Sequence, residues 1–268
     1  MSLPIDGGTR LFAIVGDPIS AVRSPEVFNA WFARAGRNAV LVPMHVAAQD
    51  LPRVVAGLQA IRNLDGIVVT MPHKAAACAL VDALGPMATV VGAINAMRRE
   101  PDGRWCGEMF DGRGFVDGLR AQGIDMAGLR VRQVGAGAAG TAVAVALAEA
   151  GVASLRISDI APERVRDVVS RVGQAYPEAT IEIAATGDVG DCELVVNVTP
   201  LGMRPEDPLP FDPDAWPASV IVADVVTQPE MTPLLLRAQA GGHRVHTGRH
   251  MHEGQARLAA AFLGVSVA

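Results

Sequence analysis

Short apolar runs alternate along the chain with longer segments in which apolar residues recur at helical spacing. Runs bounded by Gly, Pro or Asp predict buried strands, and the segments between them predict helices. Ser24-Pro25-Glu26 predicts a helix start, with Ser24 as the N-cap. The strands predicted in the first part of the chain are 11–15, 40–46, 66–70 and a hairpin of 94–99 with 104–106, and the further helices are 51–61 and 72–84.

A second series of elements begins near Arg130. Its predicted strands are 131–134, 155–158, 180–183, 194–198, 220–225 and 243–246, and its helices are 138–150, 162–172, 232–240 and 251–263. Alternation of strands and helices predicts an α/β fold with parallel sheets and right-handed crossovers. The pattern divides the chain near Asp111, and we expect the last helix to pack back on the first domain.

Composition narrows the class of protein. The 268 residues and 27.9 kDa are enough for two domains, and 50% apolar against 19% charged residues predicts a folded core. A net charge of −5 argues against nucleic-acid binding. Three scattered cysteines imply no disulfide framework, and no signal peptide or membrane span is recognisable. We therefore expect a cytoplasmic protein with a small-molecule substrate.

A glycine-rich turn is the clearest functional motif. Its residues are Gly135, Ala136, Gly137, Ala138, Ala139 and Gly140. The turn follows a predicted strand and opens a predicted helix, which is the context of a dinucleotide site. The first glycine permits the tight turn, the second admits a pyrophosphate, and the helix N-terminus attracts its charge.

Asp159 decides which dinucleotide the sequence favours. It ends the next predicted strand, where a carboxylate accepts hydrogen bonds from the adenosine ribose and repels a 2′-phosphate. Ile160 follows it, so no cation stands beside it. We expect NAD, with NADP as the second choice. The alternative is that Asp159 merely caps the helix over 162–172.

Three polar residues of the first domain are candidates for chemistry. Lys74 lies beyond the strand 66–70, Asn95 stands between apolar neighbours, and Asp111 lies at the domain junction. Ligands gather at strand ends in α/β sheets. Each residue also has a purely structural interpretation: Lys74 as a solvated surface charge, Asn95 as a buried amide, and Asp111 as a helix cap.

With these residues in view, the chain resembles the shikimate dehydrogenase family. The matching segments occur in family order: Gly16–Ile19 with Ser24-Pro25, Val69–Lys74, Gly92–Asn95, Asp111-Gly112, Gly135–Gly140, Asn197–Pro200, Asp224–Leu235 and Gly248–Gln255. The resemblance implies a substrate-binding domain of residues 1–110 plus 248–268 and a Rossmann-type domain of residues 111–247. It also implies an oxidoreductase of aromatic amino acid biosynthesis, monomeric or homodimeric.

The implied reaction interconverts a cyclic hydroxy acid of the shikimate or quinate type and its 3-keto form. Lys74 is the implied general acid and base, with Asp111 as its partner. The implied substrate ligands are Ser24, Thr70, Asn95, Thr227 and Gln255. Beside the glycine-rich turn and Asp159, the implied cofactor contacts are Thr199, Val225 and Gly248.

The departures from the family concern the substrate carboxylate and the cofactor phosphate. Val22 stands where the family has the first of two carboxylate-binding serines, and Thr227 replaces a tyrosine. Met109-Phe110 replaces the usual Asn-Thr, and Asp159-Ile160-Ala161 replaces an Asn-Arg-Thr that reads the 2′-phosphate. We expect weak affinity for shikimate or a different cyclic alcohol as substrate, with Arg23 and Arg249 as alternative carboxylate ligands.

Two other interpretations remain open. The altered substrate residues are compatible with a non-catalytic, dinucleotide-dependent metabolite sensor, because fold alone does not fix function. His250, His252 and Glu253 invite comparison with a metal site, but their spacing gives no structural zinc set, so we expect no metal.

Overall fold

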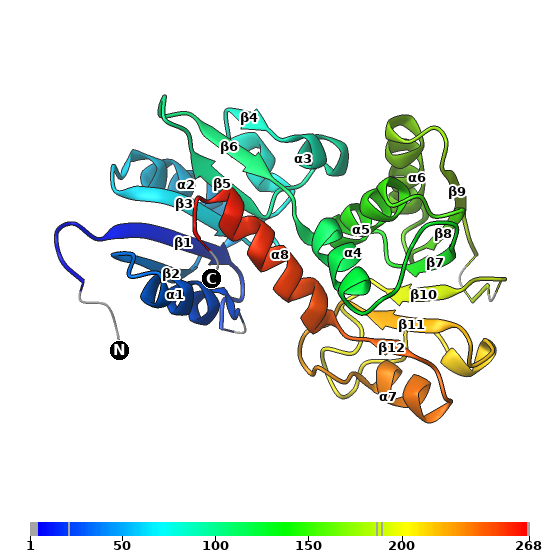
Figure 1. Ribbon diagram of the computed structural model, residues 1–268. Coiled ribbons are helices and arrows are strands. Elements are labelled where there is room, and N and C mark those ends of the chain that lie inside the picture. The colour runs from blue at the N-terminus through cyan, green and yellow to red at the C-terminus, as the bar shows by residue number, and fades with distance from the viewer. Residues whose placement is uncertain (1–4, 21, 186, 189, 267–268) are drawn as a thin grey trace. The chain divides into compact units, whose positions relative to one another are not determined.

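The computed structural model describes residues 5–20, 22–185, 187–188 and 190–266. The chain divides into two compact units: unit 1 comprises Met1–Phe110 with Ala256–Ala268, and unit 2 comprises Asp111–Gln255. Each unit is built on a six-stranded sheet flanked by helices (Figure 1). The predicted α/β class is therefore confirmed.

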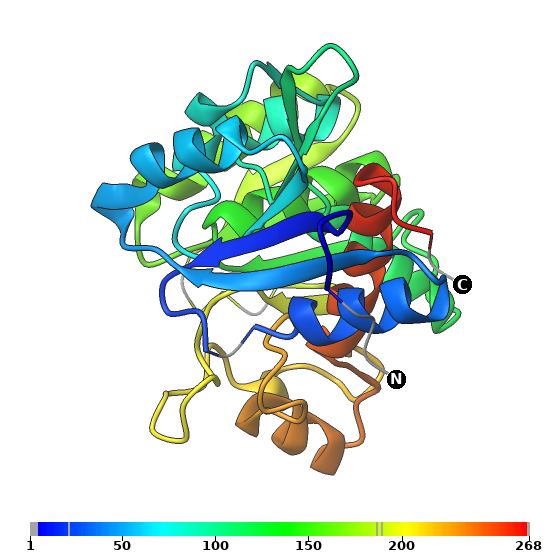
Figure 2. The same ribbon diagram turned by 90° about the vertical axis from the view of Figure 1, so that its left-hand side faces the viewer.

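The sheet of unit 1 has the strand order β2-β1-β3-β5-β6-β4. Its strands are β1 (Arg10–Gly16), β2 (Ala39–His45), β3 (Leu64–Val69), β4 (Ala83–Leu84), β5 (Ala96–Arg99) and β6 (Trp105–Glu108). The first three strands are parallel, and β1 lies directly beside β2 (Figure 2). The predicted hairpin is confirmed, because β5 and β6 pair in antiparallel fashion.

The α-helices of unit 1 bury one apolar face each: α1 (Ser24–Arg34), α2 (Leu51–Ala60) and α3 (Pro86–Val91). Unit 1 also contains the 3₁₀ turns η1 (Ala48–Asp50) and η2 (Ala76–Leu80). Phe28 and Phe32 of α1 pack with Phe12 of β1 and with Ala256 and Ala260 from the end of α8 (Gly248–Phe262). The last turns of the C-terminal helix thus complete the core of unit 1.

Two local predictions for unit 1 are wrong. The predicted helix 72–84 is replaced by η2 and by β4, which pairs with β6. Asp82 forms two hydrogen bonds with the backbone of Trp105, which hold this segment extended. Ser24 is not the N-cap of α1, because the carbonyl of Arg23 already accepts from Val27 N at 3.2 Å.

The sheet of unit 2 is parallel throughout, in the order β12-β11-β10-β7-β8-β9. Its strands are β7 (Arg130–Val134), β8 (Ser154–Ser158), β9 (Thr180–Ile183), β10 (Leu194–Asn197), β11 (Ile221–Asp224) and β12 (Val245–His246). Its helices are α4 (Asp111–Ala121), α5 (Ala138–Glu149), α6 (Pro162–Ala175), α7 (Pro233–Ala240) and the first part of α8, with the 3₁₀ turn η3 (Pro213–Ala215).

The second domain boundary lies inside a helix. The boundary expected from the sequence, between residues 247 and 248, falls at the start of α8, whereas the unit boundary follows Gln255. The helix begins three residues earlier than the expected Met251, at Gly248. Gly248 and Gln255 therefore lie on one continuous helix.

Candidate active site

Thr70, Lys74 and Asn95 gather at the carboxyl end of β3. Thr70 N donates to Val15 O at 3.0 Å, and Lys74 O accepts from Ile94 N at 2.9 Å. Asn95 O accepts from Val69 N at 2.8 Å, and its side-chain Oδ1 accepts from Phe110 N at 3.1 Å. Backbone pairing thus brings together two sequence segments that lie more than twenty positions apart.

Lys74 is also exceptional in the composition of the chain. The 23 basic residues comprise 22 arginines and this one lysine. Arginine does not release its proton at physiological pH, whereas lysine can. The sequence prediction did not use this signal, which distinguishes Lys74 from every other basic residue of the chain.

The residues expected to bind a carboxylate include one apolar side chain and two arginines that already have acidic partners. Val22 packs against the core of unit 1, while Ser24 is 5% exposed at the start of α1. Arg23 forms an ion pair with Glu26 at 3.6 Å. In unit 2, Arg249 pairs with Glu230 at 3.4 Å and with Glu253 at 3.2 Å, and Thr227 is exposed. Both proposed replacement arginines therefore face glutamates.

Asp111 and Gln255 are positioned by two close helix crossings in unit 2. Asp111 begins α4 and is 3% exposed. A Cβ on Gly112 would lie 1.9 Å from Ala142 O of α5, and one on Gly114 would lie 2.4 Å from Gln255 N of α8. Only glycines allow these approaches, which hold Gln255 against the first turn of α4.

The glycine-rich turn has the geometry of a phosphate cradle. Gly135 adopts φ +114°, and a Cβ there would lie 2.7 Å from the backbone of Val198. A Cβ on Gly140 would lie 2.4 Å from Gly135 O, whereas one on Gly137 would meet no atom within 4 Å. Gly137 thus leaves open space at the N-terminus of α5, where a pyrophosphate is bound in this motif.

Asp159 is tied to the same turn. Its Oδ2 accepts from Ala136 N at 2.7 Å and its Oδ1 accepts from Ala161 N at 2.9 Å. The N-cap of α6 is Ala161, whose side chain makes no capping hydrogen bond, so Asp159 is not the N-cap residue of α6 although it binds the N–H of Ala161. Ile160 is 95% exposed beside it.

Thr199, Val225 and Gly248 follow the carboxyl ends of β10, β11 and β12 respectively. The Cβ position of Gly135 lies 3.0 Å from Thr199 N, and that of Gly248 lies 2.5 Å from the carbonyl carbon of Val225. The structure thus places Thr199 against the glycine-rich turn and Gly248 against Val225.

A buried polar cluster of Asn197, Asp224 and Thr232 joins the ends of β10 and β11 by hydrogen bonds. Asp224 Oδ1 accepts from Asn197 Nδ2 at 3.0 Å and from Val226 N at 2.9 Å, and Oδ2 accepts from Thr232 Oγ1 at 2.8 Å. Burial raises the pKa of Asp224 to about 6, although these hydrogen bonds lower it.

Two residues of β7 were missed because the strand was interpreted as apolar. Gln133 is fully buried, and its Nε2 donates to Gly135 O at 2.8 Å and to Gly140 O at 2.9 Å. Arg132 is 2% exposed. A strand covered on both faces normally has apolar side chains throughout. Two adjacent polar residues in such a strand were therefore a sign, visible in the sequence, that both have specific partners.

The histidines of α8 serve as hydrogen-bonding and stacking groups. His250 Nε2 lies 2.6 Å from Gln122 Nε2, and its ring stacks on that of His246. Among the described residues, no group of three or more His, Cys, Asp or Glu side chains is arranged to hold a metal ion. Within the same part of the chain, no helix has the length and apolar character needed to cross a membrane.

Comparison with known proteins relates the chain to one family. Residues 14–97 match the family model described as the shikimate dehydrogenase substrate binding domain. A shikimate dehydrogenase (NADP(+)) of Rubrobacter xylanophilus is 40% identical over 89% of this chain and 84% of its own length.

Two solved structures are similar over nearly the whole chain. The Listeria monocytogenes shikimate 5-dehydrogenase in complex with shikimate and NAD has a TM-score of 0.90 and 28% identity, covering 99% of this chain and 95% of its own. The 5-ketofructose reductase of a Gluconobacter strain has a TM-score of 0.85 and 27% identity, covering 95% and 92%.

The fold and the glycine-rich turn define an NAD(P)-dependent dehydrogenase that acts on a CH–OH group. The chain belongs to the shikimate dehydrogenase family.

Proposed function

We propose that the protein interconverts a ring hydroxyl and a ketone on a cyclic hydroxy acid of the shikimate or quinate type, with Lys74 as the proton carrier. The observation that carries this proposal is the single lysine of the chain, placed beside Thr70 and Asn95 at the carboxyl end of β3. The activity printed for the Rubrobacter and Listeria relatives supports the same reaction.

The residues of unit 2 fit a nicotinamide dinucleotide. The N–H groups from Ala138 to Gly140, at the N-terminus of α5, would hold the pyrophosphate, and Asp159 would bind the adenosine ribose. Gly135 and Ala136 would shape the turn beside it, because their own N–H groups donate to Ser158 O and Asp159 Oδ2. Thr199, Val225 and Gly248 would border the nicotinamide half. When bound, the dinucleotide supplies the hydride chemistry that no side chain of the protein provides.

The chain's own residues move the proton and hold the substrate. In reduction, the Lys74 ammonium donates a proton to the carbonyl oxygen, and in oxidation the amine accepts it from the hydroxyl. The buried carboxylate of Asp111 orients this ammonium and the reacting oxygen. Thr70, Asn95 and Gln255 bind the substrate hydroxyls, which fixes the reacting carbon relative to Lys74.

A second substrate class is favoured by the packing of Val22. Burying an unpaired carboxylate is unfavourable; Val22 has no donor for it, and Arg23 and Arg249 already lie beside glutamates that would repel a second carboxylate. A neutral cyclic alcohol or keto sugar avoids this desolvation. The Gluconobacter relative is named for such a substrate, 5-ketofructose.

The names of the relatives and the residues of this chain favour different dinucleotides. The curated relative is named for NADP(+), and the Listeria structure contains NAD. In this chain the carboxylate of Asp159 stands where a 2′-phosphate would be repelled, and Ile160 provides no cation. We therefore propose NAD as the preferred cofactor.

The test compares Lys74→Met and Lys74→Arg with the wild type in both directions at 340 nm, using shikimate, quinate and neutral cyclic polyols. Both variants should lose about 10²- to 10⁴-fold in kcat, because arginine keeps the charge but cannot exchange the proton. Dinucleotide affinity, measured by fluorescence titration, should stay within about twofold.

Wild-type turnover by Lys74→Arg would show that only the charge matters and would refute the proton-transfer role. A wild type that binds the dinucleotide but turns over no alcohol in the panel would favour the metabolite-sensor interpretation.

A further inference from the structure

A buried arginine stands in the central region of the unit 2 sheet. Arg132 belongs to β7, is 2% exposed, and has its pKa lowered by burial. A parallel strand covered on both faces normally carries apolar side chains, because a charge loses its hydration there. A buried charge contributes little net stability, because the loss of its hydration offsets its interactions. The hydrogen bonds of Arg132 therefore indicate a role other than stabilising the sheet.

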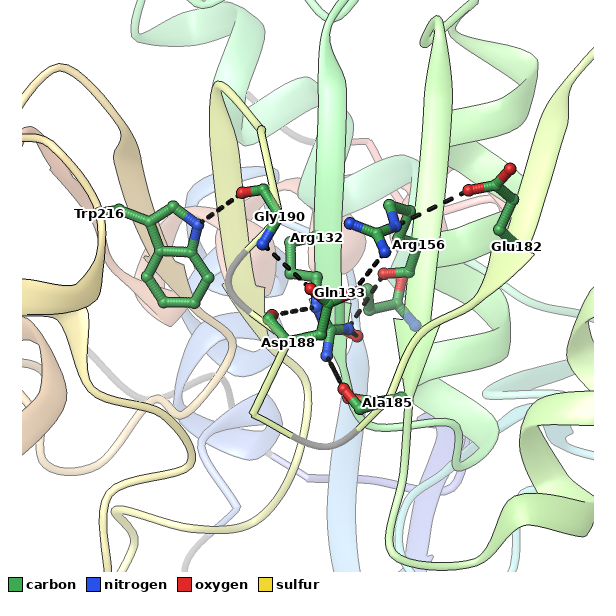
Figure 3. A network of polar contacts seen from close by, with 9 residues as sticks. Arg132, Gln133, Arg156, Glu182, Ala185, Asp188, Gly190 and Trp216 are labelled. Atoms are coloured by element: carbon green, nitrogen blue, oxygen red, sulfur yellow. Dashed lines mark hydrogen bonds and ion pairs between the residues drawn. The ribbon is translucent and has the colours of Figure 1, made fainter.

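The guanidinium uses every one of its nitrogens (Figure 3). The five hydrogen bonds run from Nε to Asp188 O (3.2 Å), from Nη1 to Gln133 O (2.8 Å) and Arg156 O (3.2 Å), and from Nη2 to Ser158 Oγ (2.8 Å) and Ala185 O (3.1 Å). A guanidinium has five N–H groups, so this set of acceptors satisfies it fully.

Gln133 O and Arg156 O lie within β7 and β8, whereas the other three acceptors belong to two places at the ligand-binding edge of the sheet. Ser158 ends β8 and directly precedes Asp159. Ala185 and Asp188 belong to the link 184–193 that joins β9 to β10. Such crossovers usually contain a helix, yet the described residues of this link form none. Arg132 therefore supplies hydrogen bonds that hold this link against the sheet.

The same link is held at a second point. Arg156 forms an ion pair with Asp188, whose Oδ1 accepts from Gly190 N at 3.1 Å. Trp216 Nε1 donates to Gly190 O at 3.2 Å. Figure 3 shows Arg132 and Arg156 converging on Asp188 from neighbouring strands. Ala185, Asp188 and Gly190 of the link are thus each held by a side chain from outside the link.

We propose that Arg132 is a positioning residue for the adenosine half of the dinucleotide. This inference rests on the proposed function. Ligands of parallel sheets bind beyond the carboxyl ends of the strands, and the ends of β8 and β9 carry Asp159 and Ala185. By fixing Ser158 and Ala185 together, Arg132 sets the position of the ribose-binding carboxylate and of the backbone that borders the adenosine.

The test measures the two halves of the dinucleotide separately, with ADP-ribose and nicotinamide mononucleotide as probes in calorimetry. Arg132→Lys keeps the charge but loses the planar fork. The matched control is Arg171→Lys of α6, where the guanidinium pairs with the exposed Asp167 at 2.8 Å and forms no hydrogen bond or ion pair with the described residues of the link.

We expect Arg132→Lys to raise the Kd for ADP-ribose and the KM for the dinucleotide by about tenfold, as for the loss of charge-assisted hydrogen bonds. The Kd for the mononucleotide, kcat at saturating dinucleotide and the KM for the alcohol should stay within about twofold, as should every constant of Arg171→Lys. A general loss of structure would instead lower kcat and weaken both probes.

Ser158→Ala tests the same inference if the Arg132→Lys variant does not fold. It removes one acceptor next to Asp159 and should raise the Kd for ADP-ribose by about threefold, as expected for one hydrogen bond. Unchanged ADP-ribose binding by folded Arg132→Lys, or failing that by Ser158→Ala, overturns this inference alone. A wild type that does not bind ADP-ribose overturns the proposed dinucleotide use as well.

Discussion

At the scale of single residues, the protein uses a few buried polar groups whose environments are sharply defined. Asp159 is held by two backbone N–H groups beside the glycine-rich turn. His246 is fully buried, with its Nδ1 3.0 Å from Gln122 Oε1 and its ring against Phe115 and His250. These two residues give predictions for cofactor choice and for pH dependence.

The cofactor prediction concerns Asp159. If its carboxylate binds the ribose hydroxyls and repels a 2′-phosphate, kcat/KM should be about 10²-fold higher with NAD than with NADP. Asp159→Asn removes the charge but keeps the size, and should narrow the preference about tenfold by improving KM for NADP. Steady-state kinetics with both dinucleotides provide the measurement. Equal wild-type efficiency with NADP would contradict the assignment, and Arg164 would then be the next residue to substitute.

The pH prediction concerns His246. Burial, followed by the nearby His250 and Arg244, lowers its pKa to about 4 from 6.5. The unfolded chain therefore takes up this proton near pH 6.5 and the folded protein only near pH 4, so stability declines as the pH falls through that window. The loss amounts to about 3 kcal/mol.

The measurement is denaturant unfolding of the wild type and of His246→Gln between pH 7 and pH 4. The difference between the two free energies of unfolding should shift by about 2–3 kcal/mol in favour of the variant as the pH falls. Taking the difference removes the opposite contribution of Asp224, whose raised pKa makes the folded protein lose stability as the pH rises towards about 6. Parallel pH profiles would show that His246 does not titrate in this way.

At the scale of elements, close helix crossings determine where the candidate catalytic groups lie. Helix α4 carries Asp111 in its first turn and approaches α5 at Gly112 and α8 at Gly114. Its second and fourth residues must therefore be glycines, although glycine weakens a helix by about 1 kcal/mol relative to alanine. Close approach outweighs helix propensity here.

The prediction at this scale is a pair of Gly→Ala variants with opposite effects. In Gly112→Ala the new Cβ would lie 1.9 Å from Ala142 O, so α4 has to shift, at a loss of about 3 kcal/mol of stability. In Gly173→Ala of α6 the new Cβ meets nothing within 4 Å, so stability should rise by about 0.5–1 kcal/mol. Thermal unfolding of both variants checks this, and equal changes would contradict the role of the crossing.

At the scale of the whole molecule, the residues proposed to bind the substrate are divided between the two units. Ser24, Thr70, Lys74 and Asn95 belong to unit 1, and Asp111, Gln255 and Thr227 belong to unit 2. The residues proposed to bind hydroxyls match the family, whereas the positions proposed for the carboxylate hold Val22 and Thr227. Substrate preference therefore has to be tested with both units altered.

The double variant Val22→Ser with Thr227→Tyr should lower the KM for shikimate about tenfold with little change in kcat, because it adds hydrogen-bond donors for the carboxylate. The KM for a neutral cyclic polyol serves as the control and should not improve. If shikimate gains nothing while the neutral substrate is turned over well by the wild type, the pocket is adapted to an alcohol without a carboxylate.

Sequence by itself determined the fold class, most strands and the glycine-rich turn, because these depend on patterns within a few residues. Apolar runs such as 11–15 and 194–198 form strands wherever they lie in the sheet. The turn from Gly135 to Gly140 needs only its glycines between a strand and a helix. The likeness to the shikimate dehydrogenase family also rested on local motifs in a fixed order.

Tertiary structure alone decided the features that depend on contacts between distant residues. The alanine-rich segment 72–84 favours a helix locally, but pairing with Trp105 and Gly107 draws its end into a strand. Arg132 conflicts with the apolar pattern of its strand, and only the tertiary structure supplies the acceptors, Ser158 Oγ and Ala185 O, that allow it to be buried. Local propensity amounts to tenths of a kcal/mol per residue, so backbone pairing and satisfaction of buried polar groups outweigh it.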